Sequence, residues 1–484
     1  MTRQEDLGQR TGVPVWLLGL LVLTVVASFS LSMEGRLVPL GYVDGAADGV
    51  EWFDLGENLA TFGVIGSVDQ PWVHRPPGYP LWVAAILRLT VDPRTHLDAA
   101  VNLRGLIALR VADSLLLGLS SLLLFLWLSR RLRKFSAFAA ALLLGTNAYS
   151  LVMATLVHYD MLQWSLLLAL ILLLDAAFHR NGAGALGPFL MAGAFLGVVT
   201  LVRPVTLLAP IGLFPAFLGR PSPRRSPWPF VLLVAGMLAA IAPWTLRNLT
   251  LTHRFIPINV QGWTAVFAST SEVAQHNPDR YEWGLLTLRH YLPIYQRVTG
   301  EAEYKFETYA KNVLPLEDAA RTAAIKNILS KPQVYLANVV KAATSLNTDV
   351  NALILTTFTR LQTGEPFNRR WILIGVRKAM SRGPEGVAFQ TLHDLLLCAA
   401  VFGLGLAVLR KDRFLLPAFG LWAAIVATHA LSYLDFFYYS VKMPFLIAFA
   451  FYGLDALPRA PRAALIVALS GLSLGLSWSM RLLG

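Results

Sequence analysis

The chain has 484 residues, of which 55% are hydrophobic and only 14% are charged, whereas soluble domains carry about 25% charged residues. This composition excludes a soluble enzyme and indicates a polytopic membrane protein. The formal net charge of +12 does not indicate nucleic-acid binding, because the basic residues gather in short loops between apolar runs, where they act as topology signals. The single cysteine, Cys398, lies inside an apolar run, which excludes a disulfide framework and a thiolate metal site.

Apolar runs of bilayer-spanning length recur along the whole chain. They predict an all-α membrane helix bundle of about eleven transmembrane helices, because a lipid-solvated backbone must satisfy its own hydrogen bonds. The runs cover residues 13–33, 104–128, 136–157, 161–178, 187–202, 204–218, 228–246, 387–409, 414–432, 436–456 and 463–480. The two short runs that meet at Arg203-Pro204 are either separate helices or one re-entrant pair, because proline ends helices.

The positions of the charges predict the orientation of the bundle. With the N-terminus in the cytoplasm, 15 lysine and arginine residues fall in short cytoplasmic segments and two in short outer loops, which is a strong positive-inside bias. The predicted regions are a cytoplasmic tail with the first helix (1–33), a first outer loop (34–103), a transmembrane bundle (104–246), a large outer loop (247–386) and C-terminal transmembrane helices (387–484). Arginine outnumbers lysine by 32 to nine, which points to a GC-rich bacterial genome. We therefore expect a bacterial inner membrane, with the active face toward the periplasm or the cell exterior.

The first outer loop contains the acidic stretch "ADGVEWFDLGENLATFG", residues 47–63. Its carboxylates are Asp48, Glu51, Asp54 and Glu57. Trp52, Leu55 and Leu59 fall on one helical face, which predicts an interfacial helix along the membrane whose N-terminus tolerates carboxylates.

The large outer loop also contains helix patterns. The sequence predicts a helix over about 316–329, a break at Pro332 and a second amphipathic helix after it. The aromatic stretch "WGLLTLRHYLPIY", residues 283–295, is a candidate for shaping an acceptor cleft. A loop of this length is long for a connector, which favours a function for it.

Cationic side chains collect at the predicted outer boundary of the membrane. His74 and Arg75 belong to "HRPPGYPLW", where prolines fix the direction of the chain. Three membrane segments end on a cation, at Arg203, Arg247 and Lys442. A charged side chain within the membrane costs about 2.5–3.5 kcal/mol on insertion scales, so a buried one usually has a partner or a function. Alternatively, each side chain could extend to the membrane surface and keep its charge in water. Together these residues predict an anion site that fits a lipid-linked phosphate.

The pair His158 and Asp160 in "LVHYDMLQW" is predicted at the outer end of a helical hairpin. The two side chains are potential ligands of a divalent metal, but two ligands do not make a site. We expect them to orient the structure or the substrate, and the sequence indicates no obligatory metal or other cofactor.

The ordered motifs resemble those of the GT-C integral-membrane glycosyltransferases, which include protein O-mannosyltransferases and lipid A aminoarabinose transferases. The matching motifs are Asp48 with Trp52 and the following small-residue helix, "RPPGYPLW", Arg203-Pro204, "PWTLRN" with Arg247, and the late signature with Tyr438, Tyr439, Lys442 and Pro444. In two places the sequence departs from this pattern. Gly49 follows Asp48 where many relatives have glutamate, so an assisting carboxylate would have to come from elsewhere, and Lys442 stands where relatives often have arginine.

The resemblance implies sugar transfer on the outer face, from a polyprenyl-phosphate donor in the lipid to an acceptor hydroxyl. Asp48 carries over as the catalytic base of an inverting displacement, with Asp44 its nearest competitor. Such a base typically contributes a 10²- to 10⁴-fold rate enhancement. The phosphate leaves as an anion and needs only cations to stabilise it. The substrate-binding candidates are His74, Arg75, Arg203, Arg247, Tyr439, Lys442, His158 and Asp160, and the expected partners are membrane lipids and a glycan, lipid or protein acceptor.

Other classes remain open at the level of sequence. A polysaccharide polymerase or ligase also has a large outer loop with basic residues, but it would use an oligosaccharide donor. A secondary transporter would show related halves and broken helices near the midplane, and the sequence shows no internal repeat. A non-catalytic scaffold role would not explain why cations are placed at several helix ends around one acidic loop.

Overall fold

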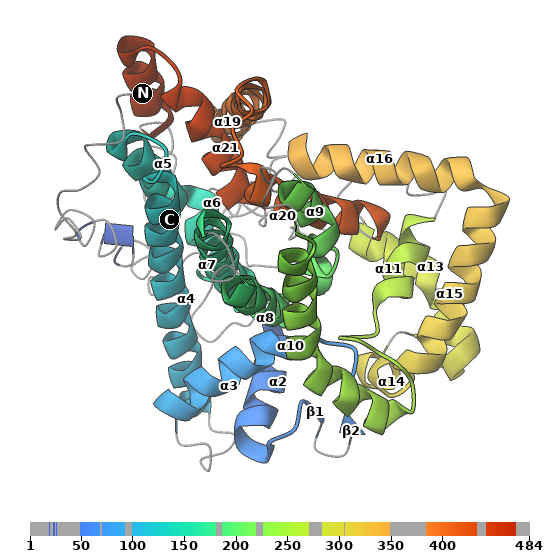
Figure 1. The fold of residues 1–484 in the computed structure, drawn as a ribbon. Coiled ribbons are helices and arrows are strands. Elements are labelled where there is room, and N and C mark those ends of the chain that lie inside the picture. Colours follow the sequence, from blue (N-terminus) through green and yellow to red (C-terminus); the bar gives the residue numbers. More distant parts are fainter. Residues whose placement is uncertain are drawn as a thin grey trace.

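The computed structural model describes residues 19, 23–24, 26, 49–67, 70–91, 99–180, 186–218, 226–270, 283–303, 305–348, 384–432 and 442–470. Nearly all of these residues are helical, and β1 (Gly66–Ser67) and β2 (Gln70–Pro71) form a two-residue antiparallel pair. The helices, shown in Figure 1, are α2 (Gly49–Phe62), α3 (Gly78–Thr90), α4 (Ala99–Leu128), α5 (Lys134–Thr146), α6 (Ala148–Met153), α7 (Asp160–His179), α8 (Leu186–Val202), the 3-10 turn η4 (Pro204–Thr206), α9 (Ala209–Leu218), α10 (Trp228–Thr252), α11 (Gly262–Ser269), α13 (Trp283–Thr299), α14 (Phe306–Lys311), α15 (Val313–Ser330), α16 (Pro332–Thr348), α19 (Pro384–Leu409), α20 (Leu416–Leu431) and α21 (Met443–Asp455).

Most of the predicted membrane helices are present where the structure describes them. Four helices, α4, α7, α10 and α19, are long and apolar enough to cross a membrane. Shorter apolar helices accompany them: α5, α8, η4 with α9, α20 and α21. The first predicted run, 13–33, lies almost wholly outside the described residues, and the last run is helical as far as residue 470, where the description ends. The chain is a multi-pass membrane helix bundle, as the sequence predicts.

One predicted span is interrupted. The run 136–157 does not form a single helix, because α5 ends at Thr146 and Asn147 has extended backbone angles. The Asn147 Nδ2 donates to the carbonyl of Leu143 at 2.8 Å and to Ser150 Oγ at 2.7 Å, while its Oδ1 accepts from Ser150 N at 2.9 Å. This side chain therefore ends α5 and begins α6, which is how asparagine competes with the helical backbone.

Small residues bring the membrane helices close together. On α8, Gly193 lies against the backbone of Leu233 on α10, where a Cβ would collide with the Leu233 carbonyl. In the same way Gly212 of α9 meets Gly420 of α20, and Gly403 of α19 meets the backbone of α21. Such contacts are typical of membrane bundles, whose helices associate by close packing because lipid offers no hydrophobic driving force.

Helix α2 is confirmed, but its apolar face is covered by protein. An interfacial helix would present this face to lipid, whereas Trp52 and Leu55 are 1% and 0% exposed and pack in the main core with Val83 of α3. The glycine at position 56 makes this possible, because a Cβ there would collide with Val83. Its orientation relative to a membrane stays a prediction.

The helices of the large outer loop form a second core beside the bundle. In Figure 1 α11, α13, α14 and α15 lie together on the right of the spanning helices, below α16. Buried Tyr291, Tyr295, Tyr309 and Leu316 make up much of this core. The predicted break is confirmed, because α15 ends at Ser330 and Pro332 begins α16.

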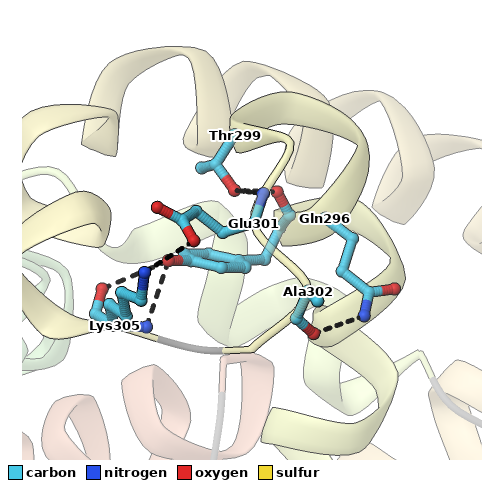
Figure 2. Close-up of polar contacts among 6 residues, drawn as sticks. Gln296, Thr299, Glu301, Ala302 and Lys305 are labelled. Carbon is cyan, nitrogen blue, oxygen red and sulfur yellow. Dashed lines mark hydrogen bonds and ion pairs between the residues drawn. The ribbon is translucent and has the colours of Figure 1, made fainter.

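A compact turn connects α13 to α14. Figure 2 shows its polar contacts: Thr299 Oγ1 accepts from Glu301 N at 3.2 Å, and Lys305 Nζ donates to Glu301 Oε2 at 2.8 Å. The hydroxyl of Tyr295 accepts from Lys305 N at 3.1 Å and donates to its carbonyl at 3.3 Å. The turn fixes the start of α14, and α14 carries Tyr309, which reaches the first outer loop.

Candidate active site

The first group of site residues is built around Glu51 in the first turns of α2. Its carboxylate accepts from His74 Nε2 at 2.6 Å and from Arg75 Nε at 2.8 Å, and it also pairs with Arg75 Nη2. Burial alone would raise the pKa of Glu51. The adjacent Arg75 charge and the hydrogen bonds from His74 and Arg75 outweigh burial and lower this pKa to about 2. Glu51 is therefore an ionised anchor for both residues of the proline-rich loop, a role that the sequence analysis did not assign to it.

His74 is fully buried where the first loop meets the large outer loop. Its ring lies 4.9 Å from the Trp72 ring and 5.9 Å from Tyr309 of α14, measured between centroids. The backbone is held as well, because Asn259 Nδ2 donates to the His74 carbonyl at 3.1 Å. Burial raises the pKa of Tyr309, so its hydroxyl stays protonated beside the histidine.

Arg247, near the end of α10, is bound to the same loop from the other side. Its Nη1 donates to the Trp72 carbonyl at 3.2 Å, its Nη2 to the Ile65 carbonyl at 3.4 Å, and its guanidinium lies 4.1 Å from the centroid of the Trp244 ring. These oxygens are neutral, and within the described parts of the chain no carboxylate forms an ion pair with Arg247. Among these residues the arginine is therefore held by neutral oxygens, next to the loop that carries His74.

The second group lies at the start of α7. His158 Nδ1 is hydrogen-bonded to Asp160 Oδ2, and Arg203 Nη1 lies 3.5 Å from Asp160 Oδ1 and 3.2 Å from Gln163 Oε1. The Arg203 guanidinium also lies 4.7 Å from the centroid of the Tyr159 ring. The structure thus brings together His158, Asp160 and Arg203, which the sequence analysis selected from two separate motifs.

Trp52 connects the two groups. The Arg75 guanidinium lies 4.9 Å from its ring centroid on one side, and the Tyr159 ring meets it edge-on at 5.6 Å on the other. A continuous series of contacts therefore runs from Arg247 through the proline-rich loop to Arg203. This series places four of the five predicted cations in one region: His74, Arg75 and Arg247 beside the proline-rich loop, and Arg203 beside the start of α7.

The remaining predicted residues are not joined to this region by the contacts described. Lys442 is buried at the start of α21, within electrostatic range of His393 on α19. Asp48 and Tyr439 lie outside the described residues, as does Asp44. Their predicted roles stay predictions, although in the sequence Asp48 comes directly before the first residue of α2.

Three buried polar residues on α3 and α4 were missed by the sequence analysis. Tyr79 of α3 is 0% exposed, and Arg110 and Asp113 of α4 are 2% and 1% exposed. Arg110 and Asp113 are separated by three positions in an otherwise apolar run, and ionisable residues inside a spanning helix are a functional signal. The run was interpreted only as a span, which hid this signal. In the part of the chain that is described, no group of three or more His, Cys, Asp or Glu side chains is arranged to hold a metal ion.

Comparisons with known proteins identify the fold. The sequence matches no protein-family model and no curated protein. The structure is similar to the archaeal oligosaccharyltransferase AglB from Archaeoglobus fulgidus in complex with an inhibitory peptide and a dolichol-phosphate, with a TM-score of 0.50 and 12% identity over 96% of this chain and 55% of AglB. It is also matched to ArnT from Cupriavidus metallidurans bound to undecaprenyl phosphate, with a TM-score of 0.39 and 14% identity over 92% of this chain and 78% of ArnT.

The low identities mean that these similarities concern the fold, and this chain spans about half the length of AglB. Function has to be argued from the site itself, because one fold can host many activities. The membrane bundle and its outer-loop helices nevertheless follow the AglB arrangement over nearly the whole chain. The chain therefore has the GT-C fold, as the motifs in its sequence indicate.

Proposed function

We propose that the chain is a membrane glycosyltransferase that moves a sugar from a polyprenyl-phosphate-linked donor to an acceptor hydroxyl. The observation that carries this proposal is Arg247, a guanidinium held by neutral oxygens beside the loop of His74 and Arg75. Such an arginine at the outer end of a spanning helix is suited to a phosphate that is anchored in lipid. The GT-C fold supports the same class of reaction.

In the proposed reaction Asp48 takes the proton of the acceptor hydroxyl as its oxygen attacks the anomeric carbon. The bond between that carbon and the phosphate oxygen breaks, the configuration inverts, and the polyprenyl phosphate leaves as an anion. No general acid is needed, because the leaving group is already charged, and cations stabilise it instead. Arg247 is the principal one, because Glu51 already balances the charge of Arg75 and Asp160 faces Arg203.

The proposal places the two outer loops, 34–103 and 247–386, on the extracytoplasmic side of a bacterial inner membrane, with the N-terminus in the cytoplasm. The donor then enters sideways from the lipid and the acceptor arrives from the aqueous phase. A polymerase or ligase would differ in the size of the glycan on the lipid, and a transporter would form no glycosylated product.

Mass spectrometry of copurifying lipids and a transfer assay test the proposal. The wild type is expected to retain a polyprenyl phosphate or its glycosylated form. Asp48→Asn is expected to abolish transfer while the protein stays folded and retains the donor, because the base is lost and the phosphate contacts remain. Glu57→Gln on α2, another acidic residue of the stretch 47–63, is the matched control and should keep transfer. Full turnover in Asp48→Asn would exclude Asp48 as the base, and the absence of any lipid phosphate from active protein would exclude the donor class.

A further inference from the structure

Helices α2, α3, α4 and α7 each contribute a buried polar atom that has no hydrogen-bond partner among the described residues. These atoms are Trp52 Nε1, Tyr79 Oη, Asp113 Oδ1 and Gln163 Nε2, and each of these four side chains is at most 1% exposed. Leaving a buried donor or acceptor unpaired costs about 1–3 kcal/mol. Four such groups on packed neighbouring helices could pair with an occupant of this region, which would remove that cost.

These atoms come from four different helices but belong to one neighbourhood. The Trp52 ring lies 5.8 Å from Tyr79 and 5.6 Å from Tyr159, and Tyr79 lies 6.2 Å from Tyr159, all edge-on. The charges of Asp113 and Asp160 add to burial in raising the pKa of Tyr79 well above its usual value. Both carboxylates therefore lie within electrostatic range of the tyrosine hydroxyl.

The chemistry of this set is complementary to a polyhydroxylated ring. Tyr79, Trp52 and Gln163 supply O–H and N–H donors, Asp113 supplies an acceptor, and the aromatic rings supply apolar walls. A phosphate is a poor match for this set, because none of its members is an arginine or lysine side chain, the groups that bind phosphate in proteins. An isolated cation is also a poor match for a set in which donors outnumber acceptors.

We propose that Tyr79, Asp113 and Gln163 form the subsite that recognises the hydroxyl groups of the donor's sugar ring. This inference rests on the proposed function, because it assumes that a lipid-linked sugar is the donor. The subsite adjoins the phosphate-binding region through Trp52, which contacts Arg75 on one face and packs against Tyr159 on another side. Asp113 is the specificity-determining member, because it is the one residue of the three with a carboxyl group, whose two oxygens can pair with two sugar hydroxyls.

Native mass spectrometry with the purified full-length chain tests this subsite. The probes are undecaprenyl phosphate and undecaprenyl phosphate carrying one neutral sugar, supplied as a hexose, a pentose or an N-acetylhexosamine. The wild type should bind at least one glycosylated form more tightly than the bare phosphate. Asp113→Asn should reduce that preference by up to about tenfold, the effect of losing one hydrogen bond, with unchanged affinity for undecaprenyl phosphate. Tyr79→Phe should reduce it by a smaller factor.

Asp175→Asn is the matched control, because Asp175 is a second buried carboxylate that lies on α7 about 22 Å along the helix from Asp160. It pairs with Arg130, and its variant should keep the preference for the glycosylated lipid. If Asp113→Asn and Tyr79→Phe keep the full preference, or if the wild type does not distinguish bare from glycosylated phosphate, the subsite is refuted and lipid-phosphate binding stands. If the wild type binds none of the lipids, the proposed function itself fails.

Discussion

Replacing Glu51 by glutamine is expected to destabilise the protein and to remove one component of its pH dependence. The carboxylate is the shared acceptor of His74 and Arg75, and its side chain is only 10% exposed. Its pKa of about 2 lies below the ordinary 4.5, and a difference of that size corresponds to about 3 kcal/mol of folding stability. The same order of magnitude is expected when one partner of a buried ion pair is removed.

The sign of the pH effect follows from the direction of the shift. The folded state binds the proton more weakly than the unfolded state, so the contribution of Glu51 is fully present above pH 4.5 and is lost as the pH falls toward 2. At pH 3 the same relation leaves about 1 kcal/mol. The stability difference between wild type and Glu51→Gln should therefore narrow by more than half between pH 6 and pH 3.

Chemical denaturation in detergent at several pH values measures this difference. Glu57→Gln, on the same helix, is the control, because Glu57 is partly exposed and forms no hydrogen bond or ion pair within the described residues. It should shift stability by less than about 0.5 kcal/mol, as surface substitutions do. If wild type and Glu51→Gln have the same free energy of unfolding at pH 6, or if their difference does not change with pH, the assignment of Glu51 as an ionised anchor is refuted.

Two further substitutions test the site and the packing. Arg247→Ala is expected to weaken retention of the lipid phosphate by about tenfold or more while its fold persists, because a charge-assisted hydrogen bond is lost; undiminished retention would contradict the role of Arg247. Gly193→Ala is expected to cost about 1–3 kcal/mol, measured by thermal unfolding, because its Cβ would meet the carbonyl of Leu233. Gly405→Ala on α19, where a Cβ meets nothing within 4 Å, should leave the stability unchanged. Equal losses of stability in Gly193→Ala and Gly405→Ala would argue against close packing of α8 and α10.

Hydropathy and proline positions were enough to predict most of the helices. Lipid imposes one requirement on every span, so a run of apolar residues identifies it without knowledge of its neighbours. The break at Pro332 was predictable for a similar reason, because proline acts locally. The break at Asn147 was not, because asparagine ends a helix only when its amide finds partners such as the Leu143 carbonyl and Ser150.

The cations of the site were easier to predict than the residues that contact them. His74, Arg75, Arg203 and Arg247 stand out in the sequence because charges are rare at membrane boundaries. The pairing of Glu51 with residues 23 and 24 positions later, and the proximity of Asp113 to Asp160, depend on how α2, α3, α4 and α7 pack. A single sequence contains no signal for such non-local contacts, and Glu51 therefore resembled any other solvated charge on a helix.

The polar groups at the two ends of α7 differ in how well the protein satisfies them. At the C-terminal end of α7, Asp175 pairs with Arg130, whose side chain is 46% exposed, and lies 3.5 Å from His179 Nδ1. This group therefore remains accessible to water and is satisfied within the protein. At the N-terminal end, Asp160 lies among fully buried groups, including Tyr79 and Asp113, whose hydrogen-bonding capacity the described residues do not fill. Stability alone favours the first arrangement. The second is retained at a cost that only binding can offset, which is why we assign sugar recognition to this end of the helix.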